Sequence, residues 1–345
     1  MNKTRNLGGM TFIDLRDRYG ITQITCDPSK MNFELPEIKS EYVLRVHGKV
    51  VARPESMINK EMITGEVELE PSRIEVLASC KELPFSVDHE NAVGEDMRLE
   101  YRYLDLRRKT MKDNTIMRHK LYMETMKFFD EKGFLHLETP TFIKNTPEGS
   151  REFVVPARFE PGKFFVLPQS PQQHKQMLMV AGFDKYYQMA RCYRDEDPRG
   201  DRQPEFTQVD FELSFVEQQD ILELMEEYCK LLAKKYYPNR PIKADPFPVL
   251  TWKEAMDTYG IDKPELRVEN VKLLELTDWA KKSEFSLFQN SACIKGMVVP
   301  KEMGRSEIEK KYEGFVKNKG AKALPWLCFT KSEGVKGSIA KFFSE

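Results

Sequence analysis

Residues 186–214 read YYQMARCYRDEDPRGDRQPEFTQVDFELS, and the architecture of the middle of the chain follows from this segment. An apolar, strand-like segment precedes the charged run Tyr193–Glu205, and a second one, Phe206–Ser214, follows it. The segment therefore predicts a strand, a long charged loop and a returning strand. On the returning strand polar residues alternate with apolar ones, so one face should be polar, formed by Gln208, Asp210 and Glu212.

The charged loop alone leaves two interpretations open. A run of charges is typical of a solvated hairpin tip. Arg194, however, lies where the first strand ends, and a guanidinium held there offers a rigid pair of donors that suits a phosphate. A polar face within a large sheet also favours a lined cavity over a core.

A second polar cluster, Gln169–Lys175, follows the apolar strand 164–167 and opens an apolar helix over 177–180. Ser170 before Pro171 is typical of a helix N-cap followed by the first helical residue. The same order places amide, hydroxyl and ammonium groups at a helix start, which favours binding of a carboxylate. A third cluster, Thr146–Ser150, indicates only a turn by itself.

The N-terminal part reads as short strands, which would bury one face by forming a small closed or nearly closed barrel. We expect strands over 11–17, 21–26, 42–53, 65–70 and 73–77, the first two as a hairpin. Phe12 offers a ring on which an unpaired base could stack, with Asp14 and Gln23 beside it for hydrogen bonds. A phenylalanine packed under a loop is the alternative interpretation.

Farther along, residues 85–110 are rich in arginine and read as a hinge. Apolar spacing predicts a helix over 114–131, a short strand over 134–138 and a second long helix over 219–236. Beyond about residue 270 the pattern changes to mixed α and β.

Composition narrows the class of protein. No stretch of the 345 residues approaches the roughly 20 apolar residues that span a membrane. The six cysteines form no C-x-x-C pair, which argues against a disulfide framework or a zinc site and favours a reducing cytoplasm. A net charge of -1 excludes a uniformly basic nucleic-acid coat, but not a local basic face.

Together these clusters resemble the class II aminoacyl-tRNA synthetases, and among them the bacterial aspartyl-tRNA synthetases, over essentially the whole chain. Leu7–Arg18 is similar to the family's anticodon-binding OB-fold, and Arg102–Arg108 to its hinge signature. The helix and strand ending at Pro140 resemble the first class II motif, a dimer-interface element. The remaining similarities are the second motif, Tyr193–Glu212, the end of the catalytic half, Tyr259–Pro264, and the bacterial insertion domain, Gly314–Lys317.

The resemblance implies an α/β multidomain protein. We expect an N-terminal OB-fold β-barrel at 1–84 that lacks its first strand, and a hinge at 85–110. An incomplete class II catalytic domain with an antiparallel sheet would occupy 111–268, and part of an α+β insertion domain 269–345.

The implied activity is ATP-dependent conversion of L-aspartate to aspartyl-adenylate, followed by transfer to tRNA-Asp by a cytoplasmic homodimer without membrane contact. Arg194 would be the catalytic residue and would contact both substrates. L-Aspartate would be held by Glu148, Ser170, Gln172, Lys175, Arg194 and Asp210. ATP would be held by Arg194, Asp195, Glu196, Gln203 and Phe206. Mg²⁺ would bind through the ATP phosphates, with no metal ligand assigned to the protein, and the anticodon would contact Phe12, Asp14 and Gln23.

Two departures from the family pattern stand out. The sequence has no third class II motif, with its ATP-binding arginine, and the match starts inside the OB-fold, which leaves out the first strand of that domain. His174 also replaces an expected aromatic or aliphatic residue. We therefore expect a truncated form with doubtful activity. Two alternatives follow, a catalytically inactive synthetase-like tRNA-binding protein and an aspartate-utilising ligase that acts without tRNA.

Overall fold

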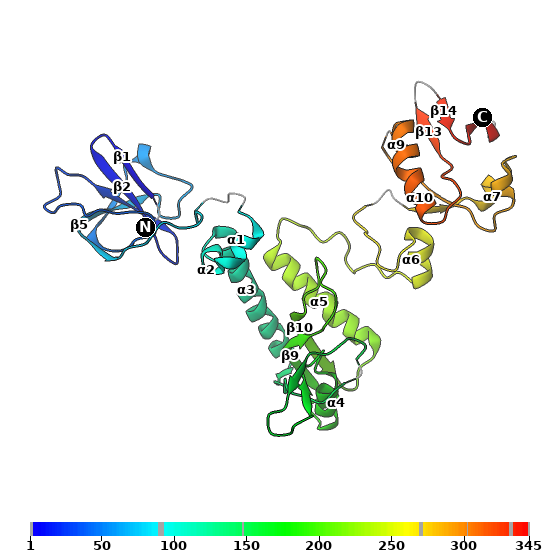
Figure 1. Cartoon of the computed structure of the whole chain (residues 1–345), viewed down its shortest axis with the longest axis horizontal. Coiled ribbons are helices and arrows are strands. Elements are labelled where there is room, and N and C mark those ends of the chain that lie inside the picture. The colour runs from blue at the N-terminus through cyan, green and yellow to red at the C-terminus, as the bar shows by residue number, and fades with distance from the viewer. Residues whose placement is uncertain are drawn as a thin grey trace. The chain divides into compact units, whose positions relative to one another are not determined.

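The computed structural model describes residues 3–88, 93–146, 148–268, 272–301, 303–330 and 334–343. The chain forms two compact units, Met1–Gln218 (unit 1) and Gln219–Glu345 (unit 2) (Figure 1). The domain boundaries expected after residues 84, 110 and 268 stay predictions, and the last adjoins residues 269–271, which lie outside the described residues.

Unit 1 begins with a five-stranded sheet in the order β1-β2-β3-β5-β4. Its strands are β1 (Lys3–Leu7), β2 (Met10–Arg16), β3 (Ile21–Cys26), β4 (Val43–Ala52) and β5 (Val67–Ala78), with a 3-10 helix, η1, at Glu55–Met57. The expected hairpin is confirmed, because β2 and β3 pair antiparallel. In the described residues β1 and β4 do not pair with each other, so the sheet has two open edges.

Two expectations about these strands are wrong. The expected strands begin only at residue 11, yet β1 precedes them and pairs with β2 throughout. Residues 65–70 and 73–77 contribute to one strand, β5, which passes through Pro71 at a register shift opposite Gly48. A Cβ at Gly48 would lie 2.2 Å from the carbonyl oxygen of Glu70, so this close approach requires glycine.

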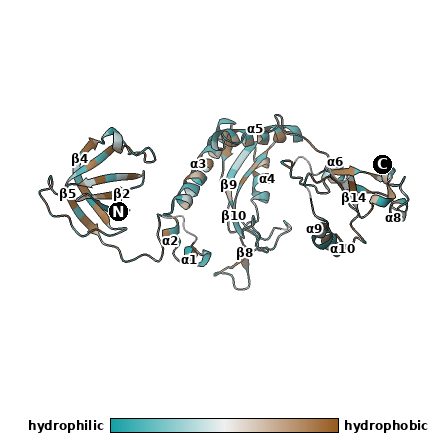
Figure 2. Cartoon of the chain, turned by 90° about the horizontal axis from the view of Figure 1, so that it is seen from above, coloured by the Kyte–Doolittle hydropathy of each residue, from teal (hydrophilic) through white to brown (hydrophobic). Residues whose placement is uncertain are grey.

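The sheet buries one face and leaves the other polar. Ile13, Ile24, Cys26 and Ile74 form its core. Polar and apolar residues alternate along the strands, as Figure 2 shows. The residues expected to contact an anticodon therefore lie on the face away from the core.

The arginine-rich segment forms two short helices, α1 (Glu95–Glu100) and α2 (Arg102–Asp105). Asp105 is completely buried. Its carboxylate lies 3.0 Å from Arg98, 2.5 Å from Arg102 and 3.5 Å from Arg108. Burial by itself raises the pKa of Asp105, but the hydrogen bond from Arg98 and the three positive charges together hold it below its usual value. These arginines are therefore engaged within the fold.

The second half of unit 1 packs a sheet against a long helix. The sheet order is β10-β9-β6, from β6 (Leu135–His136), β9 (Lys185–Tyr193) and β10 (Glu205–Leu213). On one face, Phe129 of α3 (Lys109–Glu131) lies 5.1 Å from Tyr187 and 5.5 Å from Phe211, measured between ring centroids. A hairpin of β7 (Val154–Pro156) and β8 (Phe164–Val166) leads to α4 (Gln172–Val180).

The expected strand–loop–strand is confirmed by the antiparallel pairing of β9 and β10. The sheet is not wholly antiparallel as expected, since β6 runs parallel to β9. The predicted strand over 134–138 is shorter than expected, because only Leu135 and His136 pair with β9 before the chain turns away at Pro140.

Unit 2 is a mixture of short helices and strands around a small apolar core of Ala280, Phe288 and Ile339. This confirms the expected mixed pattern. Its helices are α5 (Gln218–Tyr236), α6 (Trp252–Tyr259), α7 (Thr277–Ala280), α8 (Ser286–Gln289), α9 (Arg305–Glu307), the π-helix η2 (Ile308–Glu313), α10 (Gly314–Asn318) and the 3-10 helix η3 (Ala340–Phe342). Its strands are β11 (Leu273–Glu275), β12 (Lys295–Met297), β13 (Leu327–Thr330) and β14 (Gly334–Gly337). None of the helices described in either unit combines the length and apolar character needed to traverse a bilayer.

The Asp105 cluster generates a stability prediction. Asp105→Asn should destabilise unit 1 by about 2 kcal/mol or more at pH 7, because it removes the buried anion among three arginines. Asp113→Asn, which touches only the exposed pair with Lys109, should cost under about 0.5 kcal/mol. All three tryptophans lie in unit 2, so unfolding of unit 1 should be followed by far-UV circular dichroism.

The stabilisation by the Asp105 carboxylate should depend on pH in one direction. The lowered pKa of Asp105 makes its contribution complete above its unfolded pKa, about 4, and lost as pH falls through the folded value. The difference between wild type and Asp105→Asn should therefore shrink below pH 4. A difference that does not change with pH would contradict an electrostatic role.

Candidate active site

The register of β9 and β10 assembles one polar face. Residues directly opposite each other in an antiparallel pair share a face, and here Phe206 lies opposite Cys192, Asp210 opposite Gln188 and Glu212 opposite Tyr186. The other face is covered by α3. The predicted polar face of the returning strand is therefore confirmed.

Helix α4 places a cation over this face. The Lys175 ammonium lies 3.0 Å from Asp210 Oδ1 and 3.2 Å from Glu212 Oε2. Burial lowers the pKa of Lys175, but the two carboxylates outweigh this effect and raise it above its ordinary value. Burial raises the pKa of Asp210, against the hydrogen bond from Lys175. With both carboxylates ionised, the trio carries one surplus negative charge.

Ser170 does not cap the helix as its position suggests. Helix α4 begins at Gln172, Pro171 occupies the N-cap position and no side chain caps the helix. The Ser170 hydroxyl instead donates to Glu148 Oε2 at 2.8 Å. The N-cap interpretation is therefore wrong, because the hydroxyl is used to orient a carboxylate.

Gln169, which the sequence analysis passes over as part of a cluster, holds the loop that carries Glu148. It is buried, accepts from the Ser150 backbone N–H at 3.1 Å and donates to the Ser150 carbonyl at 2.9 Å. The sequence signal that could have indicated this role of Gln169 was an amide side chain close to the end of an apolar strand. Such a paired contact fixes a loop as a backbone ladder would.

Arg194 and the charged loop border the same face. The Arg194 backbone N–H donates to the Pro204 carbonyl at 2.8 Å, and its guanidinium carbon lies 5.1 Å from the centre of the Phe206 ring. Glu196 accepts from the Ser150 hydroxyl at 2.8 Å. The Asp195 and Gln203 side chains are exposed.

Three predicted site residues carry buried polar atoms without a hydrogen-bond partner among the described residues. They are two acceptors, Glu148 Oε1 and Asp210 Oδ2, and one donor, Arg194 Nε. Each such atom costs about 1–3 kcal/mol when left unsatisfied. An occupant that carries both a cationic donor and an anionic acceptor would satisfy all three.

The predicted anticodon residues also meet on one face. Asp14 lies opposite Gln23 and Phe12 opposite Thr25. Arg5, which the sequence analysis did not single out, donates to Asp14 at 2.8 Å and to Gln23 at 3.3 Å, while Gln23 donates to Glu68 at 3.0 Å. Phe12 is half-buried beside these groups.

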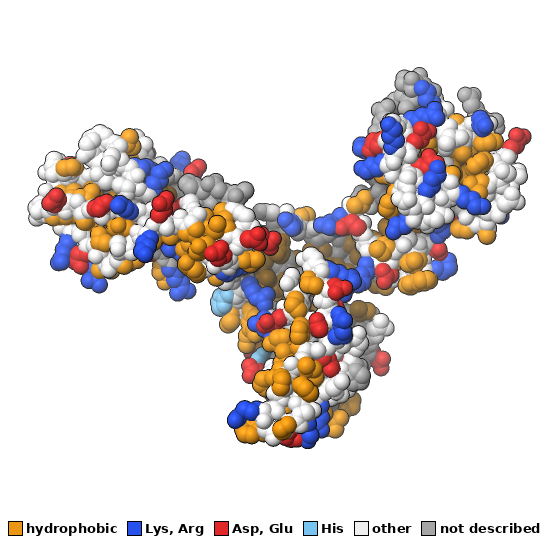
Figure 3. All heavy atoms as spheres, in the orientation of Figure 1, with side chains coloured by type: hydrophobic (Ala, Val, Ile, Leu, Met, Phe, Trp, Pro, Cys, Tyr) orange, Lys and Arg blue, Asp and Glu red, His pale blue; other side chains and the backbone are white. Residues whose placement is uncertain are grey.

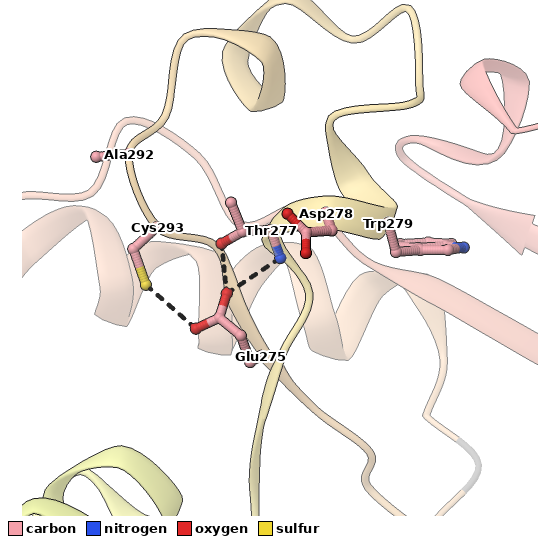
Figure 4. Close-up of a pocket in the computed structure, with 6 residues that line it drawn as sticks. All are labelled: Glu275, Thr277, Asp278, Trp279, Ala292 and Cys293. Atoms are coloured by element: carbon pink, nitrogen blue, oxygen red, sulfur yellow. Dashed lines mark hydrogen bonds between the residues drawn. The ribbon is translucent and has the colours of Figure 1, made fainter.

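A separate hollow of about 510 Å³ lies in unit 2, lined by Glu275, Thr277, Asp278, Trp279, Ala292 and Cys293 (Figure 4). Its polar groups largely satisfy one another, since Glu275 accepts from the Thr277 N–H at 3.1 Å, from the Thr277 hydroxyl and from Cys293. It lacks the unpartnered groups found on the β9–β10 face. Across the described residues no three His, Cys, Asp or Glu side chains are grouped to hold a metal ion.

The thiols give a test of this geometry. Burial raises the pKa of Cys192, on the polar face, and of Cys26, in the N-terminal core, to about 11 each. At pH 8 iodoacetamide should therefore label exposed Cys229 and Cys293 at least about 100-fold faster than the two buried thiols, as read by peptide mass spectrometry. Equal labelling of Cys192 in the folded chain would contradict the packing of the site.

Known proteins match both the N-terminal sheet and the region that contains the β9–β10 face. Residues 94–319 match the family model described as tRNA synthetases class II (D, K and N), and residues 1–77 match the OB-fold nucleic acid binding domain. The chain is 45% identical to an aspartate–tRNA ligase of Macrococcus caseolyticus, with all of this chain and 59% of that protein aligned. It is 44% identical to an aspartate–tRNA(Asp/Asn) ligase of Aquifex aeolicus, with 100% and 58% aligned.

Among solved structures, the chain resembles the asparaginyl-tRNA synthetase of Pyrococcus horikoshii bound to asparaginyl-adenylate. The TM-score is 0.56 at 20% identity, covering 67% of this chain and 52% of that one. This similarity concerns the fold alone. The chain spans about 59% of the length of the curated relatives it matches.

Proposed function

The chain belongs to the class II tRNA synthetases of the D, K and N group, and we propose that it activates L-aspartate with ATP for transfer to tRNA-Asp. The single observation that supports this most strongly is the set of unpartnered buried atoms on the β9–β10 face. An α-amino acid carries an ammonium and a carboxylate on one carbon. It can therefore satisfy two acceptors and a donor at once.

In the proposed complex the substrate ammonium binds between Glu148 and Asp210. Ser170 orients Glu148 through its 2.8 Å hydrogen bond, and Gln172 is the first residue of helix α4. The surplus negative charge of the Lys175 trio favours a cation there. The substrate α-carboxylate then faces Arg194.

The reaction requires positioning more than a nucleophilic side chain. An oxygen of the aspartate α-carboxylate attacks the α-phosphorus of ATP, the bond to the β-phosphate oxygen breaks and pyrophosphate leaves. Charge develops on the α-phosphate oxygens during this step. Arg194 neutralises that charge and also holds the attacking carboxylate, so both reactants share one fixed guanidinium.

The nucleotide would lie along the charged loop. Phe206, on the same face and next to Arg194, supports stacking of adenine, and Asp195, Glu196 and Gln203 border the path of the phosphates. Mg²⁺ prefers phosphate and water oxygens, and when bound to ATP it would neutralise phosphate charge. The described residues contain no cluster that fits the ion by itself, so we assign it no protein ligand.

The remaining parts of the proposal concern partners. The polar face of Phe12, Asp14 and Gln23 would bind the anticodon, and residues 269–345 would be part of an insertion domain. We further propose a homodimer in the cytoplasm. Support comes from the exposed apolar side chains Ile116 and Met123 on α3 and Leu135 on β6, and from six cysteines that are all unpaired.

The two alternatives are less favoured. A catalytically inactive tRNA-binding protein would have no reason to keep unpartnered buried groups on the β9–β10 face. A ligase that acts without tRNA would not need the OB-fold domain, which residues 1–77 match.

An ATP–pyrophosphate exchange assay tests the proposal, run on this chain and on any longer form of it. Exchange that depends on L-aspartate would support the proposal. No aspartate-dependent exchange in a longer form would overturn the proposal.

In a longer form of the chain, Arg194→Ala should slow adenylate formation by at least about 100-fold, because the charge on the α-phosphate loses its partner. Arg194→Lys should not restore the rate, since an ammonium lacks the planar pair of donors. Arg191→Ala, on the opposite face of β9, is the matched control and should stay within a few-fold of wild type. Rapid adenylate formation by Arg194→Ala would remove this residue from the mechanism.

Lys175→Met should raise the apparent constant for L-aspartate far more than that for ATP, because Lys175 is proposed to pair with the substrate side-chain carboxylate. It should also reduce discrimination against L-asparagine. Lys163→Met, which removes an exposed lysine from the β7–β8 hairpin, should change neither constant. Equal effects of Lys175→Met on both substrates would indicate a structural role.

A further inference from the structure

One surface of unit 2 has positive charge that the protein itself does not neutralise. Residues 303–322 contain six basic and three acidic side chains, in a chain whose net charge is -1. Each acidic side chain is already paired: Glu307 with Lys301 at 3.7 Å, Glu309 with Arg305 at 2.7 Å and Glu313 with Lys317 at 2.7 Å. The lysines left without an acidic partner among the described residues are Lys310, Lys311, Lys319 and Lys322.

Aromatic rings lie among these lysines. Phe315 is 61% exposed and Tyr312 37% exposed, although rings of this size usually find cover in a fold. The Lys311 ammonium lies 5.4 Å from the centre of the Tyr312 ring, and that of Lys319 lies 5.9 Å from the Phe315 ring. Lys311, Phe315 and Lys319 are spaced four residues apart, which places them along one side of the helix.

The backbone that carries this surface is unusual. Ile308–Glu313 form a π-helix, η2, which continues into α10. Isolated π-helical turns are rare and occur frequently at functional sites. Ile308 is buried and anchors the inner side of the turn, while Lys310, Lys311 and Tyr312 are exposed. Figure 3 shows Lys and Arg side chains gathered over the edge of unit 2 where Figure 1 places α9 and α10.

We propose that the basic aromatic surface formed by Lys310, Lys311, Tyr312, Phe315, Lys319 and Lys322 binds RNA. The lysines would contact backbone phosphates, and the exposed rings would stack on unpaired bases. An acidic protein partner would use the lysines but has no need of two exposed rings between them. The combination therefore favours nucleic acid.

This site is separate from the β9–β10 face and from the anticodon residues, and it rests on the proposed function only in its choice of RNA. The natural candidate is the part of tRNA outside the anticodon, which has a duplex stem and an unpaired 3′ end. Binding needs neither aspartate nor ATP. Its failure is therefore distinguishable from failure of the proposed aspartate activation.

The test measures binding of the 345-residue chain to a fluorescent hairpin RNA with a single-stranded CCA 3′ end and no anticodon loop. Fluorescence anisotropy over a range of salt concentrations gives the affinity and its salt dependence. The triple variant Lys310→Gln, Lys311→Gln, Lys319→Gln should bind at least about 10-fold more weakly at low salt. Its slope of log affinity against log salt should fall by about 2, as expected for three lost phosphate contacts.

The matched control removes three exposed lysines elsewhere on unit 2, as Lys263→Gln, Lys281→Gln, Lys282→Gln. It has the same net charge as the test variant and should bind like wild type. Phe315→Ser should weaken binding about 10-fold while leaving the salt slope unchanged, because it removes stacking and no charge. Since Phe315 is largely exposed, this variant should fold normally by circular dichroism.

Three results would overturn the proposal. One is equal binding by the test and control triple variants. Another is an unchanged affinity of Phe315→Ser together with equally effective competition by poly-glutamate, which would identify the surface as one for acidic polypeptides. The third comes from crosslinking. Photo-crosslinking from a version of this RNA with 4-thiouridine in place of one cytidine of the unpaired 3′ end should label the segment 311–319. Labelling confined to unit 1 would also contradict the assignment.

Discussion

The pairing register of β9 and β10 is the constraint on which the candidate site depends. It sets Asp210 opposite Gln188 and Glu212 opposite Tyr186, and at the same time it turns Tyr187 and Phe211 toward α3. A slip by one residue would exchange the two faces, placing carboxylates against the aromatic core. The packing of Phe129 against that core therefore fixes where the charged groups lie.

Around this register, some polar side chains orient other groups and do not themselves carry charge. Gln169 ties down the loop of Glu148, and Ser170 directs the carboxylate of Glu148. Lys175 holds the buried Asp210 and the half-buried Glu212 together. These contacts leave two buried acceptors and one buried donor without a hydrogen-bond partner among the described residues. An occupant should therefore carry both a donor and an acceptor.

Much of this arrangement could be predicted from the sequence, because the alternation along 206–214 and the hairpin of residues 11–26 are local signals. Two of the predictions that were wrong depended on contacts distant in sequence. Ser170 had the ordinary features of an N-cap, but its hydroxyl donates to Glu148. The continuity of β5 depended on Gly48 in another strand. The role of the hinge arginines depended instead on the burial of a carboxylate close in sequence, Asp105. Among the site residues, sequence reasoning found those that carry charge and missed Gln169, whose role depends on burial.

The central claim is that the β9–β10 face recognises an α-amino acid through its ammonium and carboxylate together. Isothermal titration of the folded chain with L-aspartate and with succinate tests it most directly, because succinate keeps both carboxylates and lacks the ammonium. We expect L-aspartate to bind at least about 100-fold more tightly, since succinate would leave Glu148 and Asp210 unpartnered. Equal affinities, or no binding of L-aspartate by the folded chain, would contradict the account.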